Sequence, residues 1–453
     1  MAAPPPKRIR RRLALAAAFG LLPLTAACGG VSLAGDDSSK SFTTMGYGLG
    51  DALSGARMDQ ARKALDIKIR VNEGSFDEQQ FLSSVAADDP PDVVNMDRAK
   101  IGGYAARGAL LPLDACAKKE HINVDAYRDP AIDEATLNGK LYGLPNSYDS
   151  RVMLINGDLL KDEGLTPEDF DTSDWDRLER TTKKLVKSDG GKLSRIGFNP
   201  KIPEFFPMWV KANGGALITD DGRTATLNSP KVVEALEYTS NLLKIQGGWG
   251  KVKALNDSFD MFGTKNPMAR KQIGALPFEN WWVNVLAQNS PKTDLVAVPF
   301  KDRKGRTINW TTGYSFAIPK GSKHPDEACT FIKAMSSAKT WQIGAKAKRA
   351  EAKKNKGPYV GDFTGNAAAD RDIETKIWKP SGNEAYDKAT RTLYDVQDKG
   401  FAVPANAAGS EFTSAWQKAV NRVLSGEQTP KEALDQAQKQ AQSVLDIANQ
   451  GKR

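Results

Sequence analysis

The chain has 453 residues, a formal net charge of +9, two histidines and three cysteines. Five cations and no acid lie in the first 27 residues, so the remainder carries only +4, which is too mild for a nucleic-acid-binding surface. The few histidines and cysteines lie in no zinc or catalytic motif. We therefore expect no nucleic-acid partner, no metal site and no cofactor.

The amino-terminal segment predicts export. Five cations, the last of them Arg12, precede an apolar run of about 15 residues, shorter than the ~20 that span a bilayer. The small residues "TAA" then precede Cys28, which resembles a bacterial lipobox, although Leu24 lies four residues before the cysteine rather than the usual three. We expect a signal peptide at 1–27, lipidation of Cys28 and a flexible polar tether at 28–40. A chance cysteine after an ordinary signal is the alternative.

The first folded segment alternates strands and helices. Strands are predicted at 42–48, at 67–74, where the pattern alternates with period two, and at 90–97. Helices are predicted at 51–66 and 77–89, and residues 99–114 are expected to form a helix, a glycine terminus and a loop. This order favours a mainly parallel sheet covered by helices on both faces. Ligands bind beyond the carboxyl ends of such strands, which are the turn at Tyr47 and the end of the third strand at Asp97.

The rest of the chain is richer in helix. Helices are predicted at 173–189, capped by Ser173 or Asp174, and at 228–248 and 429–450, with a short strand at 194–200. About 425 residues after the signal exceed one hydrophobic core, so two domains are expected. Cys116 and Cys329 lie far apart, and we interpret them as small buried apolar residues rather than a disulfide.

Two aromatic clusters indicate a ligand site. They lie at 277–289, which contains Trp281 and Trp282, and at 308–322, which contains Trp310 and Tyr314. Adjacent tryptophans point to different sides, so both cannot be equally buried in one core. A sugar ring has an apolar C–H face that lies on an indole, and its hydroxyls need the polar side chains found beside these rings. The alternative is that the tryptophans belong to the core.

Three longer stretches carry a family resemblance. They are "PPDVVNMD" with "YAARGALLPLD" at 90–114, "NGKLYGLPNSYDSRVMLINGDLLKDEGL" at 138–165, and "GYSFAIPKGSKHPDEACTFIKAM" at 313–335. In this order they resemble the family 1 extracellular solute-binding proteins of ABC importers, the group that includes maltose-binding protein. The passage at 266–282 departs from the family pattern by its length and its prolines.

The resemblance implies an α/β fold of two lobes, each a mainly parallel sheet flanked by helices, with a ligand cleft between them. It implies crossings between lobes near 145–151, near 298–306 and within 350–375. The amino-terminal lobe would then comprise 41–148 and 303–355, and the other lobe 149–302 and 356–453. The implied function is not enzymatic: a monomer tethered outside the cell membrane closes around a sugar and delivers it to a membrane permease.

The ligand contacts that we expect are aromatic rings for stacking, carboxylates that accept hydrogen bonds from hydroxyls, and one arginine: Tyr47, Asp97, Tyr148, Asp149, Trp209, Glu279, Trp281, Trp282, Trp310, Tyr314 and Arg349. Two alternatives stay open. One is a non-sugar solute such as a peptide or a polyamine, of which the polyamine would suit the acids. The other is a secreted glycan-acting enzyme, which would use two carboxylates, such as Asp97 and Glu279.

Overall fold

The structure is a computed structural model that describes residues 41–450. The predicted signal peptide, the lipidated Cys28 and the tether lie outside these residues. In the part of the chain that is described, no helix has both the length and the apolar character needed to span a bilayer.

The first sheet contains the predicted strands of the amino-terminal segment. Its five strands, in spatial order β2, β1, β3, β13 and β6, are Lys68–Asn72, Ser41–Met45, Val93–Asp97, Tyr314–Ala317 and Leu144–Pro145. Strand β1 is parallel to β2 and β3, whereas β13 is antiparallel to β3 and β6. The parallel part is therefore confirmed. Strand β13 alone runs in the opposite direction, and β6 beyond it runs in the same direction as β3.

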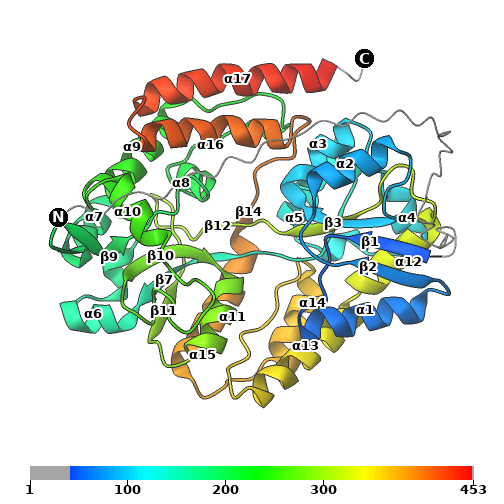
Figure 1. The fold of residues 1–453 in the computed structure, drawn as a ribbon, viewed down its shortest axis with the longest axis horizontal. Coiled ribbons are helices and arrows are strands. Elements are labelled where there is room, and N and C mark those ends of the chain that lie inside the picture. Colours follow the sequence, from blue (N-terminus) through cyan, green and yellow to red (C-terminus); the bar gives the residue numbers. More distant parts are fainter. Residues whose placement is uncertain (1–40, 451–453) are drawn as a thin grey trace, which may run out of the picture. The chain divides into compact units, whose positions relative to one another are not determined.

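Helices that connect or follow these strands pack beside the sheet. They are α1 Ala52–Ala64, α2 Glu78–Ala86, α3 Arg98–Ala106, α4 Asp114–Lys119, α5 Asp129–Asp133, α12 Pro325–Ser336 and α13 Ala338–Lys354. Helix α1 packs against α12 and α13, from segments far apart in the sequence (Figure 1). A two-stranded sheet of β4 (Thr136–Leu137) and β5 (Lys140–Leu141) precedes β6.

The second sheet is mixed rather than mainly parallel. In spatial order β11, β7, β10, β9 and β8, its strands are Leu295–Val298, Arg151–Asn156, Ile273–Glu279, Lys192–Phe198 and Lys187–Asp189. Only β9 and β10 are parallel; the other three pairs are antiparallel. Since β10 runs opposite to β7, its last residue, Glu279, pairs with Arg151, the first residue of β7. The antiparallel arrangement thus brings a strand start and a strand end together at one edge.

Helices also surround the second sheet. They are α6 Gly157–Glu163, α7 Trp175–Leu185, α8 Phe206–Ala212, α9 Pro230–Lys244, α10 Trp249–Asn256, α11 Asn280–Asn289, α15 Glu384–Val396, α16 Ser410–Leu424 and α17 Pro430–Gln450. Asp174 caps α7 by accepting a hydrogen bond from the amide of Arg177. That helix ends at Leu185, earlier than predicted, because the next residues form β8. Helices α16 and α17 pack against each other (Figure 1).

The hydrophobic core is divided between the two sheets. Trp310, in β12 (Asn309–Trp310), packs in the cluster around the second sheet, whereas Phe316 packs in the cluster around the first. A third cluster joins Trp341 of α13 to Ile373 and Trp378. We therefore propose later crossings than those expected from the sequence. The second would lie at 311–313, which moves 303–310 to the second lobe. The third would lie between Trp378 and α15, which moves 369–378 to the first lobe, whereas Val360 and Phe363 pack with the second sheet.

The interpretation of the two cysteines as unpaired is wrong. Cys116 in α4 and Cys329 in α12 form a disulfide, with their Cα atoms 5.6 Å apart. Polar pairs also join the two helices, since Lys119 contacts Asp326 and Glu120 contacts Lys333. Spacing could not reveal the pair because 213 residues separate the cysteines, and only the packing of α12 on α4 brings them together.

Candidate functional site

A cavity of about 760 Å³ lies where the chain passes between the two sheets. Its volume falls within the ~300–1,000 Å³ typical of small-molecule sites. Six of the expected contact residues line it: Asp97, Asp149, Glu279, Trp281, Trp310 and Tyr314. Since the first sheet contributes Asp97 and Tyr314 and the second contributes Glu279, both sheets face the cavity.

The first sheet presents an acid and an aromatic ring side by side. Asp97 ends β3 opposite Tyr314, which begins β13. One Asp97 oxygen caps α3 by accepting a hydrogen bond from the amide of Ala99 at 3.0 Å. Gly313 has a φ of +143°, and a Cβ there would lie 2.4 Å from the carbonyl oxygen of Ser147. Glycine is thus required where the strand enters the sheet beside the first crossing.

Arg151 fixes the second sheet's side of the cavity. Its buried guanidinium donates hydrogen bonds to Glu279 at 2.9 Å, to the Trp310 carbonyl at 2.8 Å and to Thr312 Oγ1 at 3.0 Å. The guanidinium carbon also lies 4.1 Å from the centre of the Trp310 ring. One charged group therefore orients a carboxylate and an indole together.

The carboxyl group of Asp149 is the unpaired acid of the site. Its backbone is held by a hydrogen bond from its amide to the Thr312 carbonyl at 2.9 Å. Within residues 41–450, its side chain forms no hydrogen bond or ion pair. Burial, and after it the nearby charge of Glu279, raises the pKa of Asp149 to about 6, while Arg151 and Arg98 oppose this shift. Asp149 is therefore available to accept a hydrogen bond from a ligand at neutral pH.

Three carboxylates lie close enough to Tyr314 to affect its hydroxyl and line the same cavity. Burial raises the pKa of its hydroxyl, and Asp97, Asp149 and Glu279 raise it further. The ring nevertheless leaves 45% of its surface exposed, so an aromatic face lies next to several hydrogen-bond acceptors. This combination suits a ligand that has both an apolar face and hydroxyl groups.

A smaller cavity of about 370 Å³ adjoins the first. The two share Ser147, Asp149 and Trp281 as lining residues, and the smaller one also contains Tyr47. Tyr47 is almost completely buried, and its hydroxyl donates a hydrogen bond to the carbonyl of Ser54. Lys348 lines the same space, paired with Asp362 at 2.5 Å.

Four expected contacts do not line either cavity. Trp209 and Trp282 are fully buried, and their indole N–H groups donate to the carbonyls of Pro200 and Met261. Arg349 is exposed on α13. Tyr148 is also fully buried and lies in a polar cluster beside the first crossing.

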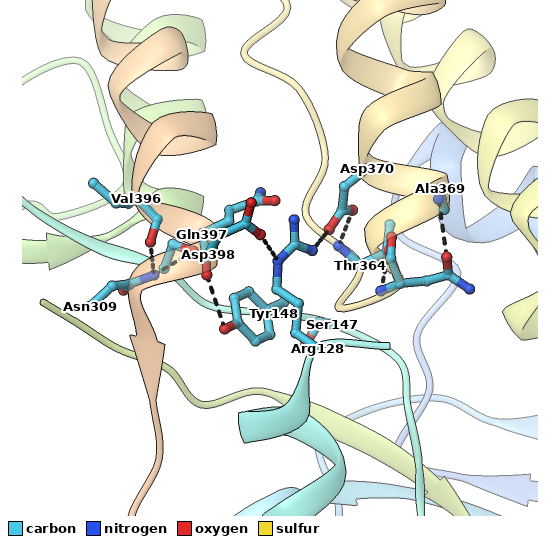
Figure 2. Close-up of polar contacts among 12 residues, drawn as sticks. Arg128, Ser147, Tyr148, Asn309, Thr364, Ala369, Asp370, Val396, Gln397 and Asp398 are labelled. Atoms are coloured by element: carbon cyan, nitrogen blue, oxygen red, sulfur yellow. Dashed lines mark hydrogen bonds and ion pairs between the residues drawn. The ribbon is translucent and has the colours of Figure 1, made fainter. Parts of the chain in front are cut away.

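The cluster around Tyr148 joins several distant segments (Figure 2). The Tyr148 hydroxyl donates to the Gln397 carbonyl at 3.3 Å. Arg128 forms ion pairs with Asp370 and, at 3.0 Å, with Asp398. None of these side chains lines either cavity, so the cluster joins connecting segments and forms no part of the cavity wall.

The site also contains residues that were not among the expected ligand contacts. Arg151, Phe205, Thr312 and Trp416 all line the larger cavity. An arginine at the start of a strand gives no signal of burial, and Trp416 looks like any apolar residue on the stripe of α16. For the residues that the structure describes, no three histidine, cysteine, aspartate or glutamate side chains are placed to hold a metal ion.

Residues 55–340 match the family model of the bacterial extracellular solute-binding proteins. The chain belongs to this family. The resemblance seen in the sequence is thereby confirmed, and with it membership in a family of binding proteins rather than enzymes.

Individual relatives of this solute-binding protein are distant. The arabinooligosaccharide-binding protein of Bacillus subtilis is 23% identical over 280 residues, which cover 60% of this chain and 63% of that protein. The maltodextrin-binding protein MdxE of the same organism is 26% identical, with 55% and 58% covered. The alignments thus span about 60% of the length of these curated relatives.

The fold comparison covers more of the molecule. The solved structure of CpMnBP1 with mannotriose bound superposes with a TM-score of 0.71, over 88% of this chain and 99% of that one, at 23% identity. This likeness confirms the two-lobe α/β class. The strand directions of the second sheet are more mixed than the sequence predicted.

Proposed function

We propose that this protein is the substrate-binding component of an ABC importer, and that it captures a carbohydrate by closure of its two lobes. The cavity carries the proposal: aromatic faces of Trp281 and Tyr314 lie beside the carboxylates of Asp97, Asp149 and Glu279. Relatives named for binding oligosaccharides support the same ligand class.

The proposed mechanism is a population shift. A sugar that contacts Tyr314 from one lobe and Trp281 from the other stabilises the closed arrangement more than the open one. The crossings absorb the change in backbone angles, and the closed form is presented to a membrane permease. Nothing in this mechanism makes or breaks a covalent bond.

A thermal-shift screen of the purified protein tests the ligand class. Mono- and oligosaccharides at about 100 times their Kd should add ~2.7 kcal/mol to the free energy of unfolding and raise the melting temperature. Amino acids, peptides and polyamines should leave it unchanged. A shift with those solutes and with no sugar contradicts the carbohydrate assignment. Labelled oligosaccharides should be recovered intact, since product formation would favour an enzyme.

Binding of a neutral sugar should weaken as the pH falls through about 6. The charged Asp149 carboxylate accepts stronger hydrogen bonds than the protonated acid does. Burial, Glu279 and Asp97 raise its pKa to about 6, against the opposing effect of Arg151 and Arg98. Titration calorimetry should show affinity falling between about pH 7 and about pH 5, by up to tenfold per pH unit. An Asp149→Asn variant should bind less tightly but with little pH dependence.

The same shift has the opposite effect on the unliganded protein. Because the folded state binds the Asp149 proton more tightly than the unfolded chain, its contribution to stability grows as the pH falls from about 6 to about 4. Weaker binding at low pH therefore cannot be explained by this group destabilising the fold. Affinity that stays constant between about pH 5 and about pH 7 contradicts a contact with Asp149.

A cationic solute, such as a polyamine or an amino sugar, is the second candidate. One observation favours it: among the described residues, neither Asp97 nor Asp149 has a basic partner, whereas Glu279 is paired with Arg151. The thermal-shift screen distinguishes a cationic solute from a neutral sugar. If the ligand must carry an amine, neutral sugars will not raise the melting temperature.

We also propose that the protein is anchored outside the cell membrane through an acylated Cys28, in line with the extracellular family. Two acyl chains would give a stable anchor where one would not. A Cys28→Ala variant that still fractionates with membranes would contradict the lipid anchor without affecting the proposed ligand.

A further inference from the structure

Exposed aromatic side chains gather at one place on the molecule. Within residues 41–450, five large hydrophobic side chains are exposed, and three of them are the aromatic residues Phe262, Trp281 and Tyr314. Trp281 and Tyr314 line the larger cavity, whereas Phe262 lies outside its lining. Phe262 leaves 65% of its surface exposed, and an exposed apolar side chain is informative where it joins others in one patch.

Phe262 continues the aromatic surface of Trp281. The two rings are within 14° of parallel, and their centres are 5.9 Å apart. Trp281 leaves 39% of its surface exposed, so the pair extends from the cavity wall towards solvent. An aromatic surface that begins in a ligand cavity and ends outside it is suited to a ligand longer than the cavity.

The backbone around Phe262 is held in place by buried groups. The indole N–H of the buried Trp282 donates to the Met261 carbonyl at 2.8 Å. Asn266, which is also buried, donates to the Gly263 carbonyl at 3.1 Å and to Ser290 Oγ at 2.9 Å. The exposed position of the ring is therefore built into the fold, and Trp282 acts as a support for it.

These contacts also give a role to the unusual passage before Trp281. The segment between α10 and β10, residues 257–272, overlaps the stretch where the sequence departs from the family pattern. Its buried Asn266 and Met268 anchor it to the second lobe, and Phe262 projects from it. Phe262 lies four residues before the unusual passage, whose first residues, Asn266 and Met268, fix the segment that presents the ring.

We propose that Phe262 is a ligand-contact residue that extends the aromatic platform of Trp281 beyond the cavity. The ligand is accordingly an oligosaccharide, with rings in the cavity and at least one further ring on Phe262. The apolar C–H face of that ring covers the exposed phenyl group, which removes apolar surface from water. This inference rests on the proposed carbohydrate function and adds the length of the ligand.

Calorimetry with oligosaccharides of increasing length tests the inference. The probes are the arabino-, malto- and manno-oligosaccharide series, from one ring to five, and the variants are Phe262→Ala and Phe262→Trp. In the series that binds, Phe262→Ala should weaken the longer members by about three- to tenfold, as expected for one aromatic contact, and leave the shortest binding member unchanged. Phe262→Trp should preserve the preference for length.

Two further variants serve as controls. Trp281→Ala should weaken ligands of every length, because its ring lines the cavity itself. Ile447→Ala removes a side chain that is equally exposed, at 67%, on α17, and should change no affinity. Phe262→Ala should melt at the temperature of the wild type, because the ring is mostly exposed.

The failures of the two proposals are distinguishable. If sugars bind but Phe262→Ala has the same effect at every length, or none, the platform is overturned and the carbohydrate function survives. A wild type whose affinity does not increase beyond the shortest binding sugar also overturns it. If no saccharide binds the wild type, the carbohydrate function fails, and the inference about Phe262 fails with it.

Discussion

Replacing Arg98 with methionine should lower the free energy of unfolding by about 3–5 kcal/mol, the cost of removing one member of a buried ion pair. Arg98 is completely buried and pairs with the buried Glu134 at 3.1 Å. Its guanidinium also donates to the carbonyls of Ser147, Thr312 and Tyr314. The variant therefore leaves the Glu134 carboxylate and the Ser147 carbonyl without this donor, whereas the carbonyls of Thr312 and Tyr314 keep their backbone donors. Urea unfolding should detect the loss.

The stability lost in Arg98→Met should increase as the pH rises. Burial raises the pKa of Glu134, and Arg98 opposes that shift, so its removal raises the pKa further. The folded variant then binds the Glu134 proton more tightly than the unfolded chain does. Its stability therefore falls as the pH rises from the pKa of Glu134 in the unfolded chain to the higher pKa in the folded state. Arg98→Met should consequently be more damaging at about pH 8 than at about pH 5. Adding Glu134→Gln should remove this pH dependence.

A surface arginine provides the matched control. Arg62 pairs with Asp59 on α1, and both side chains are about half exposed. Arg62→Met should cost no more than about 1 kcal/mol, as is typical of exposed ion pairs. Equal losses for the Arg62 and Arg98 variants would contradict the role assigned to the buried pair.

The neighbours Tyr148 and Asp149 show where sequence reasoning stops. Both were expected to face the cleft, yet neighbouring side chains of an extended segment point in opposite directions. The structure directs Asp149 to the cavity and Tyr148 to the buried carbonyl of Gln397. The sequence locates such a crossing, but which of its alternating side chains faces the ligand depends on strand pairing.

The adjacent tryptophans illustrate the same limit on a helix. Their sequence predicts that they point to different sides, which is confirmed by a buried Trp282 beside an exposed Trp281. Which one is exposed depends on where α11 begins, and that is set by the end of β10 at Glu279. Long periodic elements such as α9 and α17 were predictable because their pattern is local.

Buried charges were the least predictable part of the site. Arg98 and Arg151 follow aspartate and serine in stretches that read as polar connections. Their burial depends on carbonyl groups contributed by residues 310–314, more than 150 positions later, as the hydrogen bonds from Arg151 to Trp310 and from Arg98 to Thr312 show. Local periodicity contains no information about these partners, because Arg98 and Arg151 lie beside residues 310–314 only in the folded chain, after it has crossed between the lobes.

The disulfide should contribute about 2–4 kcal/mol to the free energy of unfolding. It closes a loop whose ends are separated by 213 residues, and long loops lose the most entropy when the unfolded chain is cross-linked. A Cys116→Ala, Cys329→Ala double variant should therefore unfold at a lower urea concentration than the wild type. Because Cys116 and Cys329 do not line either ligand cavity, its affinity for sugar should be unchanged.

The single variants separate a covalent bond from simple packing. If the cysteines act as one disulfide, either single replacement should cost nearly as much as both, and a reducing agent should destabilise the wild type but not the double variant. The pairs Lys119–Asp326 and Glu120–Lys333 remain in every variant, so they do not account for the difference. Small additive losses, together with a wild type unaffected by reductant, would show that the two thiols are not joined. The stability of the first lobe would then depend on packing between α4 and α12 alone.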